Sequence, residues 1–164
     1  MVAILPPAIR RRTRGVSSHA VTTFEGYDEK VAKGLARSHD KAGGLPGFLG
    51  LRITDYWAGG LRAEVEIRDD LLTPFKNLHG GVLAAIVDHM LGTVCYPVIP
   101  PGAWAATTEF KVNYLAPVTE GTLSATSEII SLTKRTAVVR IEVKNGERLV
   151  CAAQGTVLIM APKG

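Results

Sequence analysis

The sequence predicts an α+β protein in which a curved antiparallel sheet of five to six strands wraps around one central buried helix. Six segments show the alternation or composition of β-strands, and most connections between them are too short for the crossover helices that a parallel sheet needs. Segment 80–95 consists almost entirely of apolar or small residues. A helix of this composition has no solvated face, so we expect the sheet to cover it on all sides.

The N-terminal part of the chain precedes the predicted sheet. Residues 1–24 contain four arginines and no acidic residue, which is typical of a flexible basic leader. Residues 25–44 are predicted to form a surface helix, centred on 27–41, and a linker. The remaining residues, 45–164, are expected to form a single folded domain with a substantial core.

Two strands are predicted before the apolar helix. The first follows the glycine-rich break at 43–47 and runs from Phe48 to Tyr56. The second spans 61–68, where apolar residues alternate with arginine and glutamate, the pattern of a strand with one wet face. Residues 58–60, Ala-Gly-Gly, are predicted to form the hairpin turn between them.

Four strands are predicted after the apolar helix, which should end near Cys95 because several prolines follow it. An Asn-Gly pair at 145–146 predicts a two-residue type I′ turn between the last two strands. The predicted strands span 104–114, 122–132, 136–144 and 148–160.

Composition excludes several classes of protein. The 164 residues are 46% hydrophobic and carry a net charge of +4 that comes from the leader, so no basic stripe for nucleic acid is present on the predicted domain. Cys95 and Cys151 lie in apolar runs without metal-ligand spacing, which argues against a disulfide framework or a zinc site and favours a reduced, cytoplasmic location. We expect no apolar run to be long enough for a membrane span, so no membrane partner is predicted.

The start of the central helix is the first candidate for chemistry. His79, Gly80 and Gly81 precede the apolar run, where backbone N–H groups lack partners within the helix and its dipole is positive. The Gly80 N–H is the candidate donor to a polarised carbonyl or oxyanion, and Gly81 allows substrate to approach the backbone. His79 could orient this turn or bind substrate; a capping or core role is the alternative.

Asp88 is the second candidate, because it is the one acidic residue within the apolar helix. A carboxylate there requires a partner or a function, and the small residues one turn away leave space beside it. It could act as a general base or a nucleophile, or be a hydrogen-bonded core carboxylate. Because it follows His79 by nine residues and faces another direction, the two should meet only between subunits.

The stretch 77–92, with His-Gly-Gly followed by an acid nine residues after the histidine, resembles the hotdog-fold acyl-CoA thioesterases of the phenylacetate-pathway type. The block 107–117 is similar to the strand that follows the helix in that family. The resemblance implies a hotdog fold, and a homodimer or homotetramer with active sites at the dimer interface. It also implies that Asp88 is the base or nucleophile, that the Gly80 N–H polarises the thioester, and that Thr107 helps to hold the water.

The resemblance is incomplete just before the helix. Many family members have an asparagine six residues before the histidine, where this chain has Thr73, and Asn77 stands only two residues before it. Asn77 and Thr73 are therefore alternative groups for orienting the substrate. Family members hold the phosphates of CoA with basic loop residues, which makes Lys134 and Arg135 candidate contacts; an ordinary solvated turn is the alternative.

Together these observations predict an enzyme that hydrolyses an acyl-CoA to a free acid and CoA, without a metal or redox cofactor. Two alternatives stay open. One is a non-enzymatic acyl-CoA sensor on the same fold, since fold does not determine function. The other is a hotdog hydratase or dehydratase, which would need a catalytic histidine where the helix interior offers Asp88.

Overall fold

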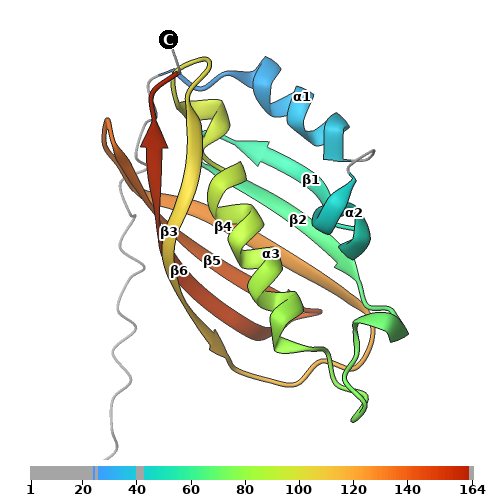
Figure 1. Ribbon diagram of the computed structural model, residues 1–164. Helices are drawn as coiled ribbons and strands as arrows, with labels where there is room; N and C mark the ends of the chain where they lie inside the picture. Colours follow the sequence, from blue (N-terminus) through green and yellow to red (C-terminus); the bar gives the residue numbers. More distant parts are fainter. Residues whose placement is uncertain (1–23, 25, 40–42, 163–164) are drawn as a thin grey trace, which may run out of the picture.

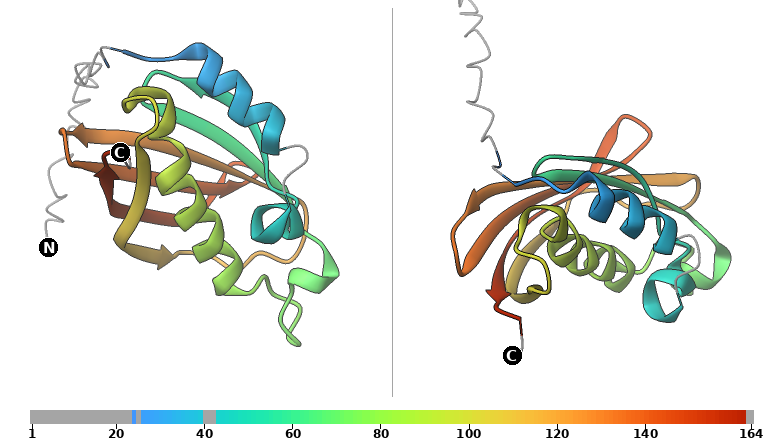
Figure 2. Two further views of the ribbon diagram at one scale, coloured as in Figure 1. Left: turned by 45° about the horizontal axis from the view of Figure 1, so that its top comes forward. Right: turned by 90° about the horizontal axis from the view of Figure 1, so that it is seen from above.

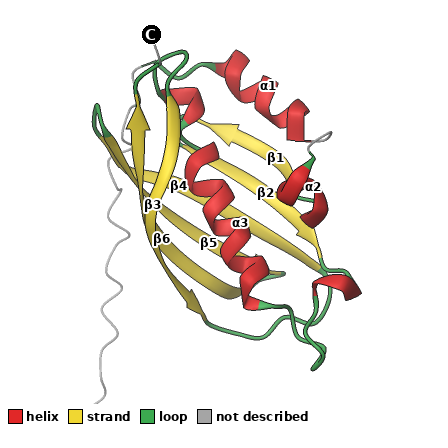
Figure 3. Cartoon of the chain, viewed as in Figure 1, coloured by secondary structure: helices red, strands yellow, loops and turns green. Residues whose placement is uncertain are grey.

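The structure is a computed structural model that describes residues 24, 26–39 and 43–162, so the predicted leader lies outside the described residues apart from Phe24. Its elements form a sheet layer and a helix layer (Figure 1; Figure 3). In chain order the elements are α1 (Glu29–His39), α2 (Gly44–Leu49), β1 (Arg52–Trp57), β2 (Gly60–Glu66), η1 (Asp69–Leu71), α3 (Gly80–Thr93), η2 (Tyr96–Val98), β3 (Trp104–Tyr114), β4 (Thr122–Leu132), β5 (Thr136–Asn145) and β6 (Arg148–Met160).

The six strands form one antiparallel sheet in the order β1-β2-β4-β5-β6-β3. The sheet curves around α3, which lies against its concave face (Figure 2). This confirms the predicted fold class, with six strands rather than five. The edge strands are β1 and β3, and β3 pairs with β6 alone.

The predicted first strand began too early. Phe48 and Leu49 belong to the short helix α2, and β1 begins at Arg52. Pro46 lies in the first turn of α2, where its missing N–H costs no hydrogen bond. Gly50 then takes a left-handed conformation, with φ of 68°, and its N–H donates to the carbonyl of Gly47, which ends the helix.

The last hairpin turn lies one residue further along than predicted. Asn145 pairs with Arg148, so the loop consists of Gly146 and Glu147. Gly146 has φ of 58°, whereas Asn145 and Glu147 are not at positive φ, so a type I′ turn over Asn145 and Gly146 is wrong. The glycine supplies the one left-handed residue that this loop requires.

The core lies between the concave face of the sheet and one side of α3. The helix residues that face it include Leu83, Ile86, Val87, Met90 and Leu91, all almost fully buried. The opposite side of α3 is open: Gly81 and Asp88 are exposed. The expectation that every side of this helix is covered is therefore wrong for a single chain.

The stretch Gly80–Val98 is long and apolar enough, by length and composition, to cross a membrane, contrary to the expectation from the sequence. In the structure it is α3 followed by the separate turn η2, and 56% of it is buried within the protein. We therefore assign it as the core helix. Cys95, within this stretch, and Cys151 are both buried and free.

Candidate active site

The start of α3 is held in place by backbone hydrogen bonds. The N–H of Leu78 donates to the carbonyl of Val118 at 2.6 Å, and the N–H of His79 donates to Leu71 at 3.1 Å. These bonds join the segment before the helix to both neighbouring loops. The direction in which the first N–H groups of α3 point is thereby fixed.

Most N–H groups in the first turn of α3 already have partners. His79 is the N-cap residue, and its Nδ1 accepts from the N–H of Gly81 at 3.0 Å. The N–H of Val82 donates to the carbonyl of His79 at 2.9 Å. Among the described residues nothing accepts from the N–H of Gly80. The N–H of Gly80, the predicted oxyanion donor, is thus unpaired within the described part of the chain.

The hydrogen bond to Gly81 also defines the role of His79. A neutral imidazole whose Nδ1 accepts a hydrogen bond carries its proton on Nε2, so the outer nitrogen of this exposed ring is a donor. The N–H of Gly81 is used by the cap, and a Cβ on Gly81 would stand 3.2 Å from the same ring nitrogen. His79 is therefore a helix-capping residue, the alternative that the sequence left open for it, and its cap holds the turn that carries Gly80.

A pocket of about 410 Å³ opens beside Gly80, and most of its lining is apolar. A Cβ atom on Gly80 would stand 3.3 Å from the Cζ of Tyr114, so only glycine leaves clear space there. The residues that line the pocket are Asn77, Leu78, Gly80, Leu83, Tyr114, Leu115, Ala116, Pro117 and Val118.

Asp88 lies on the open side of α3, away from this pocket. It follows Gly80 by eight residues, which is about 12 Å along the helix axis. A single thioester carbonyl cannot contact both groups of one chain across that distance. The structure therefore does not bring Asp88 and Gly80 together within one chain.

Thr107 lies on β3 alongside the middle of α3. The helix and the strand run antiparallel, because Gly80 approaches Tyr114 while Gly92 approaches the carbonyl of Ala105. Asp88 and Thr107 both fall between these two contacts. A β-bulge follows Thr107, since the pairing with β6 shifts register before Glu109. The Thr107 hydroxyl has no partner among the described residues.

The loop before α3 forms a tight turn that contains Thr73 and Asn77, the two candidate residues for orienting the substrate. The N–H of Thr73 donates to the carbonyl of Asn77 at 2.7 Å, and Lys76 has φ of 61°. The amide Nδ2 of Asn77 donates to the carbonyl of Phe75 at 3.3 Å, so it is turned back onto its own turn. Asn77 lines the pocket, whereas Thr73 does not.

Lys134 and Arg135 are exposed in the turn between β4 and β5. They border a second pocket of about 360 Å³ together with Pro100 and Ala103, which follow the C-terminal end of α3. Within one chain this basic pair therefore lies at the opposite end of the helix from Gly80.

Comparison with known proteins identifies the family. The model of the thioesterase superfamily matches residues 75–152. A 1,4-dihydroxy-2-naphthoyl-CoA hydrolase of Listeria monocytogenes is 28% identical over 117 residues, which are 71% of this chain and 95% of that protein. A Saccharolobus solfataricus protein named "Putative esterase" is 31% identical over 110 residues, which are 66% of this chain and 73% of that protein. This chain belongs to the thioesterase superfamily.

A solved structure shares the fold of this chain. A Ralstonia eutropha protein described as phenylacetic acid degradation-related has a TM-score of 0.67 at 24% identity, covering 74% of this chain and 96% of that one. The likeness confirms the predicted hotdog fold. The names of the relatives, hydrolase and esterase, support thioester hydrolase activity for this superfamily member.

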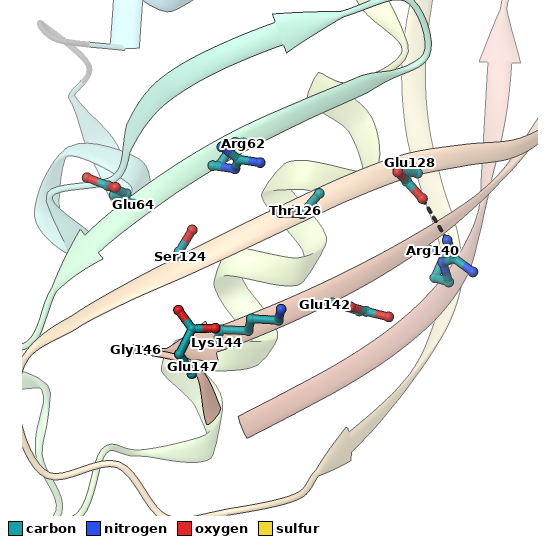
Figure 4. Close-up of a pocket in the computed structure, with 10 residues that line it drawn as sticks. All are labelled: Arg62, Glu64, Ser124, Thr126, Glu128, Arg140, Glu142, Lys144, Gly146 and Glu147. Carbon is teal, nitrogen blue, oxygen red and sulfur yellow. Dashed lines mark hydrogen bonds and ion pairs between the residues drawn. The ribbon is translucent and has the colours of Figure 1, made fainter. Parts of the chain in front are cut away.

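Another hollow of this thioesterase-superfamily protein, of about 510 Å³, lies on the outer face of the sheet, away from α3 (Figure 4). Its side chains carry both signs of charge, and Arg140 pairs with Glu128 at 2.7 Å. Exposed pairs of this kind are typical of a solvated surface. Among the described residues, no group of three or more His, Cys, Asp or Glu side chains could hold a metal ion.

Tyr114 is the pocket residue that sequence reasoning missed. It is the last residue of the predicted strand 104–114, and the sequence did not single it out as a site residue. That strand runs antiparallel to α3, so its last residue reaches the first residue of the helix. Tyr114 could have been predicted only if the direction of this strand relative to the helix were known, and the sequence does not give that direction.

Proposed function

We propose that this protein hydrolyses an acyl-CoA thioester to a free carboxylic acid and CoA. The observation that carries the proposal is the unpaired N–H of Gly80, a residue that begins a helix and lines a mainly apolar pocket. A thioester supplies a carbonyl oxygen for this donor and an acyl group for the apolar lining. The CoA-thioester substrate of the Listeria relative supports the same substrate class.

The chemistry requires a base or nucleophile as well as the donor, and Asp88 is the candidate. As a base, its carboxylate takes a proton from water while the water oxygen bonds to the thioester carbon. The carbonyl electrons move onto oxygen, where the Gly80 N–H stabilises the charge. They return as the C–S bond breaks, and the CoA thiolate leaves and takes up the proton.

As a nucleophile, Asp88 would attack the thioester carbon itself and release the thiolate, which leaves a mixed anhydride. Water then hydrolyses the anhydride to the acid and regenerates the carboxylate. Both routes use the same donor and give the same products. They differ in whether the acyl group is bound covalently to Asp88 before it leaves.

A homodimer built on β3 would bring the two halves of the site together. β3 has one unpaired edge, beside the open side of α3. If two β3 strands pair along this edge, the two-fold axis passes between them at their middle, and the two copies of α3 run antiparallel. The Gly80 end of one helix then lies beside the Gly92 end of its partner. The carboxylate of Asp88, four residues before Gly92, then lies near the Gly80 of the other subunit.

The same symmetry assigns roles to the remaining candidates. Thr107, at the level of Asp88, would hold the attacking water through its unpaired hydroxyl. His79 orients the Gly80 turn through its cap, and Asn77 borders the pocket that receives the substrate. Lys134 and Arg135 lie near the C-terminal end of α3. In the two-fold symmetric dimer this end would lie beside the pocket of the partner, where the two basic side chains would bind CoA phosphates.

The first test is thiol release from a panel of acyl-CoAs by the native protein, Asp88→Asn and Asp88→Ala. Glu142→Gln serves as the control, because Glu142 is an exposed carboxylate on the outer face of the sheet. We expect both Asp88 variants to lose most of kcat and the control to keep it. Folded Asp88 variants with native kcat would refute the assignment, and binding without thiol release would support the sensor alternative.

The second test is complementation between two inactive chains. Gly80→Pro removes the donor and Asp88→Ala removes the carboxylate, so a mixed dimer has one site with both groups intact. Random pairing during co-expression yields about half mixed dimers, so about a quarter of the native activity should return. If each chain held a complete site, the mixture would stay inactive.

A further inference from the structure

Tyr114 has an unused hydroxyl group beside Gly80. Its Cζ, the ring carbon that carries the hydroxyl, lies 3.3 Å from the position of a Cβ on Gly80, and both residues line the same pocket. The side of the ring toward solvent is open, since Tyr114 is 53% exposed. Its hydroxyl has no partner among the described residues, whereas that of the mostly buried Tyr56 donates to the carbonyl of Thr93.

Two neighbouring donors are already used within the chain. The N–H of Gly81 donates to the His79 ring, and one of the two N–H bonds of the Asn77 amide donates to the carbonyl of Phe75. The His79 ring itself does not line the pocket. Among the described residues, the N–H of Gly80 and the hydroxyl of Tyr114 are therefore two unpaired donors that adjoin one another in this pocket.

An oxyanion gains from more than one donor. A thioester oxygen that becomes negatively charged has three lone pairs, and each preorganised donor stabilises the charge more than it stabilises the neutral carbonyl. A phenol is a stronger donor than a backbone amide, and this one is held at the strand end by the sheet. The two donors belong to different elements: Gly80 is the first residue of α3, and Tyr114 is the last residue of β3.

We propose that the Tyr114 hydroxyl is the second donor to the thioester carbonyl, acting with the N–H of Gly80. This inference rests on the proposed thioester hydrolysis. No proton is transferred: the phenol keeps its proton and donates a hydrogen bond that shortens as charge develops on the oxygen. Tyr114 is thus a catalytic residue in the sense of contact with the reacting atoms.

Tyr114→Phe isolates the hydroxyl, because it keeps the ring that packs on Gly80. We expect kcat to fall about 100-fold, with KM within about twofold of native, as for the loss of one oxyanion donor. Tyr27→Phe makes the same chemical change on the far side of the molecule, beside α1, and should keep native kcat. Native kcat in folded Tyr114→Phe would overturn the proposal.

A second measurement does not depend on turnover. The ketone analogue of the best acyl-CoA has CH₂ in place of sulfur, and its ¹³C-labelled carbonyl reports hydrogen bonding through its infrared stretching frequency. We expect a lower frequency when it is bound to the native protein or to Tyr27→Phe than when it is bound to Tyr114→Phe. Equal frequencies in all three would overturn the role of Tyr114.

The two measurements separate the proposals. If the native protein binds the ketone but releases no thiol from any acyl-CoA, hydrolysis is refuted, and the carbonyl frequency still decides whether Tyr114 donates to the ligand. If thiol is released and both kcat and the frequency are unchanged in Tyr114→Phe, hydrolysis stands and the second donor is refuted. Failure to bind the ketone and to release thiol would overturn both.

Discussion

Replacement of Gly80 by proline tests the oxyanion donor directly, because proline has no N–H. The backbone at this position suits proline: Gly80 is the first residue of α3, where proline is favoured. His79, which would precede it, has φ of −66° and ψ of 130°, within the extended region that a residue before proline requires. No internal hydrogen bond is lost, since the N–H of Gly80 has no acceptor among the described residues.

Gly80→Ala is the matched control. Alanine and proline both introduce a Cβ that would lie 3.3 Å from the ring of Tyr114, so both narrow the pocket at that point. They differ in the N–H, which alanine keeps. The ratio of the two kcat values therefore measures the donor rather than the added carbon.

The loss of one oxyanion donor costs about 2.7–4 kcal/mol, so kcat of Gly80→Pro should be about 10²–10³-fold below that of Gly80→Ala. The assay is thiol release at saturating acyl-CoA, with circular dichroism to show that both variants are folded. Equal kcat values in the two variants would refute the reasoning. A rise in KM alone would show instead that the proline ring obstructs the pocket.

Three further predictions concern buried groups. Ser127→Ala should raise the free energy of unfolding in urea by about 1 kcal/mol, because the fully buried Oγ has no partner among the described residues; a loss of stability would contradict this. Gly155→Ala should lower the free energy of unfolding by about 1–3 kcal/mol, because the new methyl would stand 2.7 Å from the Cβ of Phe110. Native stability of this variant would show that β3 can shift away from the methyl without loss of stability. Burial raises the pKa of Cys95 to about 12 and of Cys151 to about 11, so both stay protonated at pH 8 and should react with thiol reagents only after denaturation; mass spectrometry of labelled native protein checks this.

The strands could be predicted because each carries its own signal. The bounds of β3, β4 and β6 agree with the predicted segments, since side chains alternate along them and turn residues flank them. The short helix α2 could not be predicted in the same way. Its six residues include two glycines and a proline, and it ends where the N–H of the left-handed Gly50 donates to the carbonyl of Gly47. The low helix propensity of glycine and proline disfavours a helix of this composition.

The candidate site was only partly accessible to sequence reasoning. The cap of α3 could be predicted from local chemistry, because His79, Gly80 and Gly81 are neighbours in the chain. The pocket could not, because it joins the start of α3 to the end of β3. Tyr114 reaches Gly80 only because the strand runs back along the helix, and alternation reveals which face of a strand is apolar but not which residue that face meets.

The open side of α3 explains why its composition indicated complete burial. Around Asp88 the helix presents Ala84, Ala85 and Gly92, which are only half-buried in one chain. A solvated surface does not need residues this small and apolar, but a second chain packed closely against the helix does. The proposed dimer provides that cover. It also avoids burying an unpaired carboxylate during folding, because Asp88 stays in water until the two chains associate. The apolar composition of a helix can thus reflect contacts with a second subunit as well as contacts within one chain. Asp88, the acidic residue on the open side of α3, lies where the proposed active site would form between the two subunits.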